Sequence, residues 1–131
     1  MEMGIYATQA VDLNRVDLVL DALIGYGLTG DPRGRIADWI MQVNAAACPV
    51  LALDTPSGLN TTTGVPGHPC MRATATMTLA LPKTGLIAPQ AAASVGDLYL
   101  ADISVPPRLY ARLGFELPPI FIHEQSLNIN S

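Results

Sequence analysis

Apolar and polar residues are grouped along this chain in a way that predicts alternating strands and helices. Residues 18–24 are apolar almost throughout, which is typical of a strand buried on both faces of a parallel sheet. In residues 35–47, where Pro32 is expected in the first turn, apolar side chains recur at helical spacing. The face of this helix that they form carries Ile36, Trp39, Ile40 and Val43. Residues 49–54 are the next apolar run, so the pattern predicts a βαβ unit with two parallel strands.

The second half of the chain continues this alternation. Residues 60–69 are rich in turn-forming residues and predict a long loop, and loops of that length commonly carry function. The other elements that the pattern predicts are strands over residues 74–81, 97–103 and 120–122, a short helix around residues 91–93 and a helical turn over residues 106–113. Together these elements indicate an α/β fold with a mostly parallel sheet.

Composition and charge limit the class of protein. The chain has 131 residues, half of them hydrophobic, which is enough for one domain with a single core. Its net charge is −4 and its seven Lys and Arg residues are scattered, so no nucleic-acid partner is indicated. Without a leader-like start or a membrane-spanning apolar run, the chain is expected to be soluble, cytoplasmic and without a membrane partner. Cys48 and Cys70 lack metal-binding spacing and are expected to be free, buried thiols.

Two carboxylates are placed at the ends of predicted strands. Residues 54–58 read Asp-Thr-Pro-Ser-Gly, in which the proline stops the strand and the glycine permits a tight turn. Asp21 lies in the earlier apolar run, which leads into a glycine-spaced loop at residues 25–30. Because parallel strands end at the same edge of a sheet, Asp21 and Asp54 are expected to share the edge where open α/β proteins bind ligands.

The glycine-spaced loop permits more than one interpretation. Residues 25–30 match the Gly-x-Gly-x-x-Gly pattern of dinucleotide-binding loops, and Asp54 stands where a ribose-binding acid is expected. However, Asp31 and Pro32 follow the third glycine, so the helix begins after the loop, and a carboxylate there opposes a bound pyrophosphate. A fragment of a Rossmann dehydrogenase is disfavoured because no catalytic acid/base constellation or substrate domain accompanies the loop. A glycine-rich connection without a ligand stays open.

Four blocks of the sequence, taken in order, resemble one known family. Residues 19–30 read Val-Leu-Asp-Ala-Leu-Ile-Gly-Tyr-Gly-Leu-Thr-Gly, and residues 51–60 read Leu-Ala-Leu-Asp-Thr-Pro-Ser-Gly-Leu-Asn. Residues 80–86 read Ala-Leu-Pro-Lys-Thr-Gly-Leu, and residues 96–107 read Gly-Asp-Leu-Tyr-Leu-Ala-Asp-Ile-Ser-Val-Pro-Pro. In order and spacing the blocks resemble the NAD(P)H-hydrate epimerases, which carry the YjeF N-terminal domain. The resemblance covers residues 17–109, most of the chain.

The resemblance implies a fold, a reaction and a set of site residues. The fold is a three-layer α/β/α Rossmann-like sandwich with a mostly parallel sheet. The reaction interconverts the R and S epimers of NADHX and NADPHX, the hydrated nicotinamide cofactors, in cofactor repair. Asp54 is implied as the catalytic acid or base, and Asp21 and Ser57 as ligands of a potassium ion, a hard cation that takes oxygen ligands. The residues implied in substrate binding are Gly25, Tyr26, Gly27, Leu28, Thr29, Gly30, Asp31, Asp54 and Lys83.

The residues by themselves leave an alternative open for each of these roles. Asp54 could instead cap the turn at residues 57–58 by accepting backbone N–H bonds. Asp21 is an acid within an apolar strand and needs either a cation or several N–H donors. Lys83 could reach a phosphate or pair with Asp54. Ser57 lacks the glycine two residues earlier that a hydrolase nucleophile has, so a cation ligand or a turn hydroxyl is favoured.

One part of the family pattern is not found in the sequence. The family opens with another βα half that carries a loop rich in glycine and asparagine, and residues 1–16 are too few to hold it. The chain is therefore expected to be a single YjeF N-terminal-type domain over residues 1–131, truncated at its amino end. Because half of such a sheet exposes an apolar edge, we expect a homo-oligomer or pairing with a chain that supplies this half. The alternative function is a non-catalytic module that binds a dinucleotide or a partner.

Overall fold

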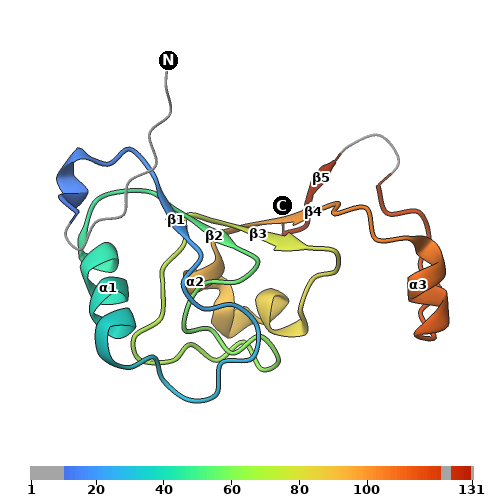
Figure 1. Cartoon of the computed structure of the whole chain (residues 1–131), viewed down its shortest axis with the longest axis horizontal. Helices are drawn as coiled ribbons and strands as arrows, with labels where there is room; N and C mark the ends of the chain where they lie inside the picture. Colours follow the sequence, from blue (N-terminus) through green and yellow to red (C-terminus); the bar gives the residue numbers. More distant parts are fainter. Residues whose placement is uncertain (1–10, 122–124, 131) are drawn as a thin grey trace.

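The computed structural model describes residues 11–121 and 125–130, which form one sheet with short helices (Figure 1). The strands are β1 (Val19–Asp21), β2 (Val50–Leu53), β3 (Ala75–Leu79), β4 (Asp97–Ala101) and β5 (Ser126–Asn128). The helices are α1 (Gly34–Ala45), α2 (Ala92–Val95) and α3 (Pro107–Arg112), and the 3-10 turns are η1 (Leu13–Arg15), η2 (Thr84–Ile87) and η3 (Pro89–Ala91). The strand order is β1-β2-β3-β4-β5, parallel from β1 to β4 and antiparallel at β5. The predicted α/β fold with a mostly parallel sheet is confirmed.

The helices between the strands pack against one face of the sheet. Paired residues of neighbouring strands point to the same face, so Ala52, Thr76 and Leu98, all fully buried, lie on one side. Helix α1 packs on this side through Ile40, and the segment from η2 to α2 packs there through Val95, as Figure 1 also shows. The described residues thus form two layers, and the third layer of the expected sandwich is not seen among them.

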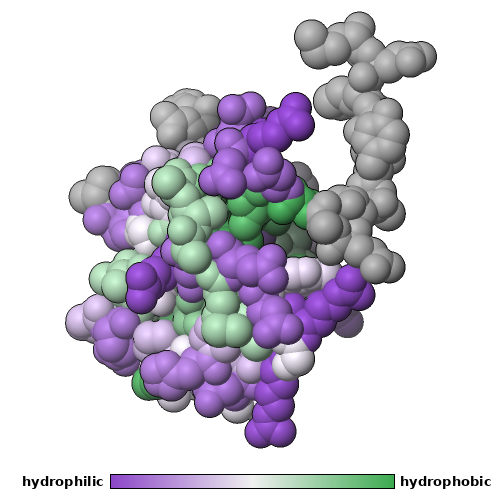
Figure 2. All heavy atoms as spheres, turned by 90° about the vertical axis from the view of Figure 1, so that its left-hand side faces the viewer, coloured by the Kyte–Doolittle hydropathy of each residue, from purple (hydrophilic) through white to green (hydrophobic). Residues whose placement is uncertain are grey.

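Strand β1 differs from its prediction. It covers only Val19–Asp21, and the side chains of Leu18 and Leu20 are 53% and 58% exposed, so the expectation of burial on both faces is wrong. The reason is that β1 is the last strand on its side of the sheet in the described part of the chain, where no element covers Leu20. Figure 2 looks onto this side of the molecule and shows hydrophobic surface between hydrophilic side chains. A groove of about 530 Å³ runs there, lined in part by Val19, Leu20, Trp39 and Val43.

Two further predictions need correction. Helix α1 begins at Gly34 after the N-cap residue Arg33, so Pro32 lies before the helix and not in its first turn. Residues 120 and 121 form no strand, and residue 122 lies outside the described residues. The last strand is β5, whose Leu127 pairs with Leu100 of β4. Pattern alone could not select this segment, because Ser126-Leu127-Asn128 contains only one apolar residue, whereas residues 120–122 are all apolar. No helix in residues 11–121 and 125–130 is long and apolar enough to cross a membrane.

Gly96 is required where α2 turns into β4. Its φ is +62°, and a Cβ at this position would clash with the backbone oxygen of Thr74. We therefore expect Gly96→Ala to lower the free energy of unfolding by at least about 2 kcal/mol in urea denaturation. Gly25→Ala is the matched control, because no atom of the described residues, apart from the two chain neighbours, lies within 4 Å of its added Cβ. This variant should change the free energy of unfolding by less than about 1 kcal/mol. Equal effects of the two variants would contradict the prediction.

Candidate functional site

The two predicted carboxylates lie at the same edge of the sheet. Strand β1 ends at Asp21, and Asp54 directly follows β2. The two strands are parallel, with Asp21 paired to Ala52, so both acids are at the carboxyl ends of their strands. This prediction is confirmed. The structure places the two acids in separate hydrogen-bond networks, however, and each network has its own partners.

The Asp21 carboxylate is buried and bonded to Ser57. Asp21 is only 1% exposed. Its carboxylate accepts a hydrogen bond from the backbone N–H of Ser57 at 2.7 Å and one from the hydroxyl of Ser57 at 2.6 Å. The backbone N–H of Leu23 donates to the same carboxylate at 3.3 Å, and the backbone N–H of Ile24 donates to Ser57 Oγ at 2.9 Å. The two residues predicted to act together are therefore in direct contact. N–H and hydroxyl donors compensate the buried charge.

The turn at residues 57–58 is capped by Asp21 and not by Asp54. Among the described residues the backbone N–H of Ser57 donates to Asp21, 36 positions earlier, and Asp54 makes its contacts elsewhere. The alternative in which Asp54 caps this turn is therefore wrong. Asp54 does not cap the turn because its backbone, with a φ of +68°, turns the side chain toward the end of β3.

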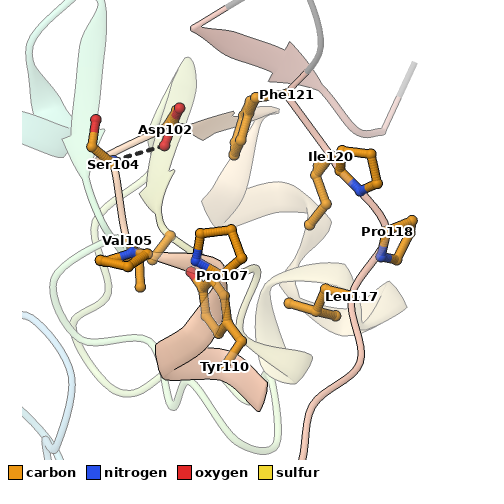
Figure 3. Close-up of a pocket in the computed structure, with 12 residues that line it drawn as sticks. Asp102, Ser104, Val105, Pro107, Tyr110, Leu117, Pro118, Ile120 and Phe121 are labelled. Carbon is orange, nitrogen blue, oxygen red and sulfur yellow. Dashed lines mark hydrogen bonds between the residues drawn. The ribbon is translucent and has the colours of Figure 1, made fainter. Parts of the chain in front are cut away.

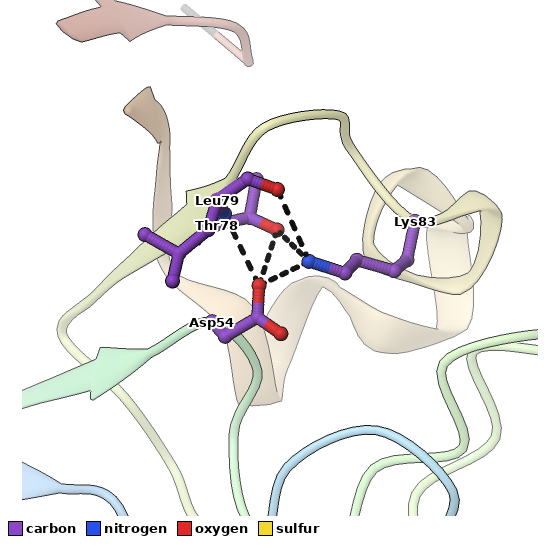
Figure 4. A network of polar contacts seen from close by, with 4 residues as sticks. All are labelled: Asp54, Thr78, Leu79 and Lys83. Atoms are coloured by element: carbon purple, nitrogen blue, oxygen red, sulfur yellow. Dashed lines mark hydrogen bonds and ion pairs between the residues drawn. The ribbon is translucent and has the colours of Figure 1, made fainter. Parts of the chain in front are cut away.

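Asp54 forms a second network with residues of β3 and with Lys83 (Figure 4). Its Oδ1 accepts the hydroxyl of Thr78 at 3.3 Å and the backbone N–H of Leu79 at 3.1 Å, and it forms an ion pair with Lys83 Nζ. Lys83 Nζ also donates to Thr78 Oγ1 at 3.1 Å. Lys83 was expected either to reach a phosphate or to pair with Asp54, and in the structure it pairs with Asp54. The Asp54 and Lys83 side chains are 25% and 19% exposed, so the pair stays accessible at the edge of the sheet.

The glycine-spaced loop lies at the surface beside the turn that follows β2. Tyr26 is 74% exposed, and Asp31 Oδ1 accepts the backbone N–H of His68 at 2.9 Å. A cavity of about 160 Å³ separates the loop from the segment after Gly58. Its lining residues are Leu28, Gly30, Asp31, Gly58, Asn60, Val65, Pro66 and Gly67. Asp54 and Lys83 do not line this cavity, so the structure joins only part of the predicted substrate-binding set.

The two cysteines are free thiols, as predicted, but both are half-buried where full burial was expected. Cys48 Sγ donates to the carbonyl of Val16 at 3.2 Å, and Cys70 Sγ donates to Ser94 Oγ at 3.5 Å. Burial raises the pKa of the Cys70 thiol, and the nearby Asp21 carboxylate adds to this rise. The thiol of Cys70 is therefore held in its protonated form at neutral pH, which is the form with low reactivity.

A second large cavity, of about 510 Å³, lies between the end of β4 and α3 (Figure 3). Proline and aromatic side chains form much of its wall, among them Pro107, Tyr110 and Phe121. Asp102 accepts the backbone N–H of Ser104 at 2.7 Å at its rim. None of the site residues predicted from the sequence lines it.

Thr78 and Ile24 contact the predicted site residues and were not found by sequence reasoning. Thr78 is fully buried, and its hydroxyl lies between Asp54 and Lys83. The sequence contains a signal for Thr78, because Thr74, Thr76 and Thr78 alternate with apolar residues along a predicted strand. Buried hydroxyls need hydrogen-bond partners, so buried threonines of a strand point to polar groups beside it. Ile24 contributes only backbone groups, for which the sequence has no signal.

Comparison with known proteins identifies the family. A family model described as YjeF-related protein N-terminus matches residues 2–85. The chain belongs to this family. Within the YjeF-related proteins, the NAD(P)H-hydrate epimerase of Dehalogenimonas lykanthroporepellens is 42% identical over 105 residues, which cover 80% of this chain and 41% of that protein. The NAD(P)H-hydrate epimerase of Truepera radiovictrix is 48% identical over 98 residues, covering 74% of this chain and 43% of that protein.

A longer enzyme and a solved structure match as well. The bifunctional NAD(P)H-hydrate repair enzyme Nnr of Moorella thermoacetica is 43% identical over 99 residues, 76% of this chain and 19% of the enzyme. The crystal structure of the yeast protein YNL200c has a TM-score of 0.68 at 16% identity, covering 90% of this chain and 49% of the yeast chain. The yeast structure supports the fold. The chain spans about two fifths of the length of the epimerases it matches.

Proposed function

We propose that this chain takes part in the epimerisation of NADHX and NADPHX in cofactor repair. The observation that carries the proposal is Asp54, a half-buried carboxylate at the ligand-binding edge of the sheet with one oxygen held by three donors. Relatives with 42% and 48% identity are named NAD(P)H-hydrate epimerase, and they share the stretch in which this carboxylate lies.

The chemistry asked of Asp54 is proton transfer without oxidation or reduction. The epimeric carbon carries a hydroxyl and is bonded to the ring nitrogen, so its configuration inverts through a planar intermediate. In one route Asp54 gives a proton to the hydroxyl, the C–O bond breaks to release water, and the nitrogen electron pair forms a C=N bond. Water then adds to the opposite face and returns the proton to Asp54. In the other route Asp54 takes the hydroxyl proton as the C–N bond breaks and passes it to the ring nitrogen, which leaves an open-chain aldehyde and an N–H group. Closure on the opposite face of the carbonyl reverses both proton transfers.

Substrate binding is proposed for the glycine-spaced loop. Its residues are exposed except for Leu28, which is half-buried, and the cavity between the loop and Gly67 is open to a ligand group. The residues proposed to contact the hydrated dinucleotide are Gly25, Tyr26, Gly27, Leu28, Thr29, Gly30 and Asp31. Asp54 lies at the same edge of the sheet, which suits a substrate that reaches from this loop to the carboxylate.

A potassium ion is proposed beside Asp21 and Ser57. The donor set fits a hard cation, because Ser57 Oγ lies 2.6 Å from Asp21 Oδ1 and 3.2 Å from the carbonyl oxygen of Ile24. Thr55 Oγ1, in the same turn, is buried and has no hydrogen-bond partner among the described residues. When bound, the ion would supply positive charge near the substrate phosphates. Asp21, Ser57 and Ile24 would hold it with oxygen atoms.

Residue-by-residue binding tests this assignment. The chain labelled with ¹⁵N is titrated with NADHX in potassium and again in sodium, and backbone amide shifts are recorded. The proposal predicts shifts concentrated at residues 21–31 and 54–58, with tighter binding in potassium. Shifts confined to the cavity beside α3 would contradict it. Binding at the expected residues with no interconversion of the epimers would favour the alternative, a non-catalytic binding module.

Association with a second chain is part of the proposal. Leu20 of β1 and Leu18, which directly precedes it, are exposed. Strand β1 is the last strand on its side of the described sheet, and such an apolar edge is normally covered. We expect the chain to elute as a dimer or larger species in size-exclusion chromatography with light scattering. Leu20→Lys should shift it toward monomer, whereas Leu113→Lys, at an exposed position in the turn after α3, should not. A wild-type chain that stays monomeric at all concentrations would contradict this expectation.

A further inference from the structure

Every hydrogen bond that Asp54 accepts through its carboxylate from the described residues ends on Oδ1. The donors are Thr78 Oγ1 at 3.3 Å, the backbone N–H of Leu79 at 3.1 Å, and Lys83 Nζ. Figure 4 shows the three dashed lines meeting at one oxygen, while the other oxygen points away from all three donors. The backbone is fixed as well, since the N–H of Asp54 donates to the carbonyl of Met77 at 2.8 Å. One carboxylate oxygen is anchored, and the other is left for a different partner.

Lys83 has no donor left for a substrate phosphate. An ammonium group has three N–H donors. In the structure Nζ pairs with Asp54 Oδ1 and donates to Thr78 Oγ1 at 3.1 Å and to the carbonyl of Leu79 at 3.4 Å. All three acceptors belong to Asp54, Thr78 and Leu79. We call the network of Thr78, Leu79 and Lys83 around Asp54 Oδ1 the anchor. The hydroxyl of Thr78 links the pair, because it accepts from Lys83 and donates to Asp54.

We propose that Lys83 and Thr78 are positioning residues, which hold Asp54 Oδ1 so that Oδ2 meets the hydroxyl of the substrate. This inference rests on the proposed function, and it replaces a phosphate-binding role for Lys83. The proton moves between Asp54 Oδ2 and the substrate hydroxyl oxygen as the C–O bond breaks or forms. Lys83 keeps its three protons throughout, and Thr78 keeps its hydroxyl proton. Neither side chain touches the substrate.

Steady-state kinetics separate positioning from substrate binding. Misplacing a reacting group costs up to about 100-fold in rate, so Lys83→Met should lower kcat roughly 10- to 100-fold and leave KM unchanged. Thr78→Val should lower kcat in the same way, and Thr78→Ser should restore it. Thr76→Val is the matched control: Thr76 is equally buried on the same strand, but its hydroxyl donates to the carbonyl of Val95 and not to Asp54. It should leave kcat unchanged.

A spectroscopic measurement tests the anchor independently of activity. Lys83 is the only lysine in the sequence, so the side-chain ¹H–¹⁵N spectrum of a tag-free chain contains one ammonium signal. Bonded to three acceptors, this group should give a slowly exchanging signal in the wild type. Asp54→Asn and Thr78→Val should shift the signal or speed its exchange, and Thr76→Val should do neither.

The outcomes are distinct. A rise in KM with unchanged kcat in Lys83→Met would overturn the inference and assign Lys83 to substrate binding. Unchanged kinetics in both Lys83→Met and Thr78→Val would also overturn it. If the wild type does not interconvert the epimers, the proposed function fails. The ammonium signal of Lys83 then shows, without any activity measurement, whether Lys83 is bonded to Asp54 and Thr78. A fast-exchanging signal that is insensitive to Asp54→Asn and Thr78→Val would refute the anchor.

Discussion

Replacing Asp54 with Asn is expected to slow the interconversion of R and S NADHX about 100- to 10,000-fold while the fold persists. General acid–base groups typically contribute this much to a rate. The amide oxygen of Asn can still accept from Thr78, Leu79 and Lys83, and its NH₂ group would take the place of Oδ2, which accepts from no described residue. The substitution therefore removes the proton-transfer group and keeps the anchor. Chromatography of the two epimers over time measures the rate.

The matched control is Asp97→Asn. Asp97 is an exposed carboxylate at the first position of β4, which is the opposite edge of the parallel sheet. It should leave both the rate and the circular dichroism spectrum unchanged. If Asp54→Asn is as active as the wild type, Asp54 has no part in the reaction. If Asp54→Asn unfolds, its main role is to hold the end of β3.

Replacing Asp21 with Asn is expected to lower the free energy of unfolding by about 2–4 kcal/mol. The side chain is buried and accepts two donors from Ser57 and one from Leu23. In either orientation the NH₂ group of Asn faces a backbone N–H, of Ser57 or of Leu23, so a buried donor loses its acceptor. Urea denaturation followed by circular dichroism measures the loss. With a potassium ion bound, the variant should also need more potassium for activity.

Asp17→Asn provides the comparison for Asp21. Asp17 is exposed, two residues before β1, and its substitution should change the unfolding free energy by no more than about 0.5 kcal/mol. Equal stability of the Asp21→Asn and Asp17→Asn variants would contradict the assignment of Asp21 to the cap of the Ser57 turn. A higher potassium requirement in Asp21→Asn alone would support its role as a cation ligand.

The shared edge of Asp21 and Asp54 could be predicted from the sequence because it depends only on the direction of two strands. A helix between two apolar runs makes the strands parallel, and parallel strands end together. The contacts of each acid could not be predicted in this way. Thr78 reaches Asp54 because Leu53 is in register with Met77, which places the next residue of β3 level with the residue after β2. Sequence pattern does not determine such a register.

Burial was the other quantity that the pattern could not determine. An apolar run indicates that a strand prefers to be covered, and Leu20 is apolar, but its exposure depends on which elements pack beside β1. The same applies to the capping of the Ser57 turn. Asp54 is three residues from Ser57 in the sequence, yet Asp21, far away in the chain, accepts the N–H because β1 and β2 lie side by side. Local spacing favoured the wrong acid.

The most direct test of whether this chain takes part in NAD(P)HX epimerisation starts from a single epimer. Purified S-NADHX is incubated in potassium buffer with and without the wild-type chain, and the appearance of R-NADHX is followed by NMR. We expect R-NADHX to form faster with the chain, in proportion to the chain's concentration, and Asp54→Asn to abolish most of the acceleration. Formation of R-NADHX at the same rate with and without the chain would contradict it.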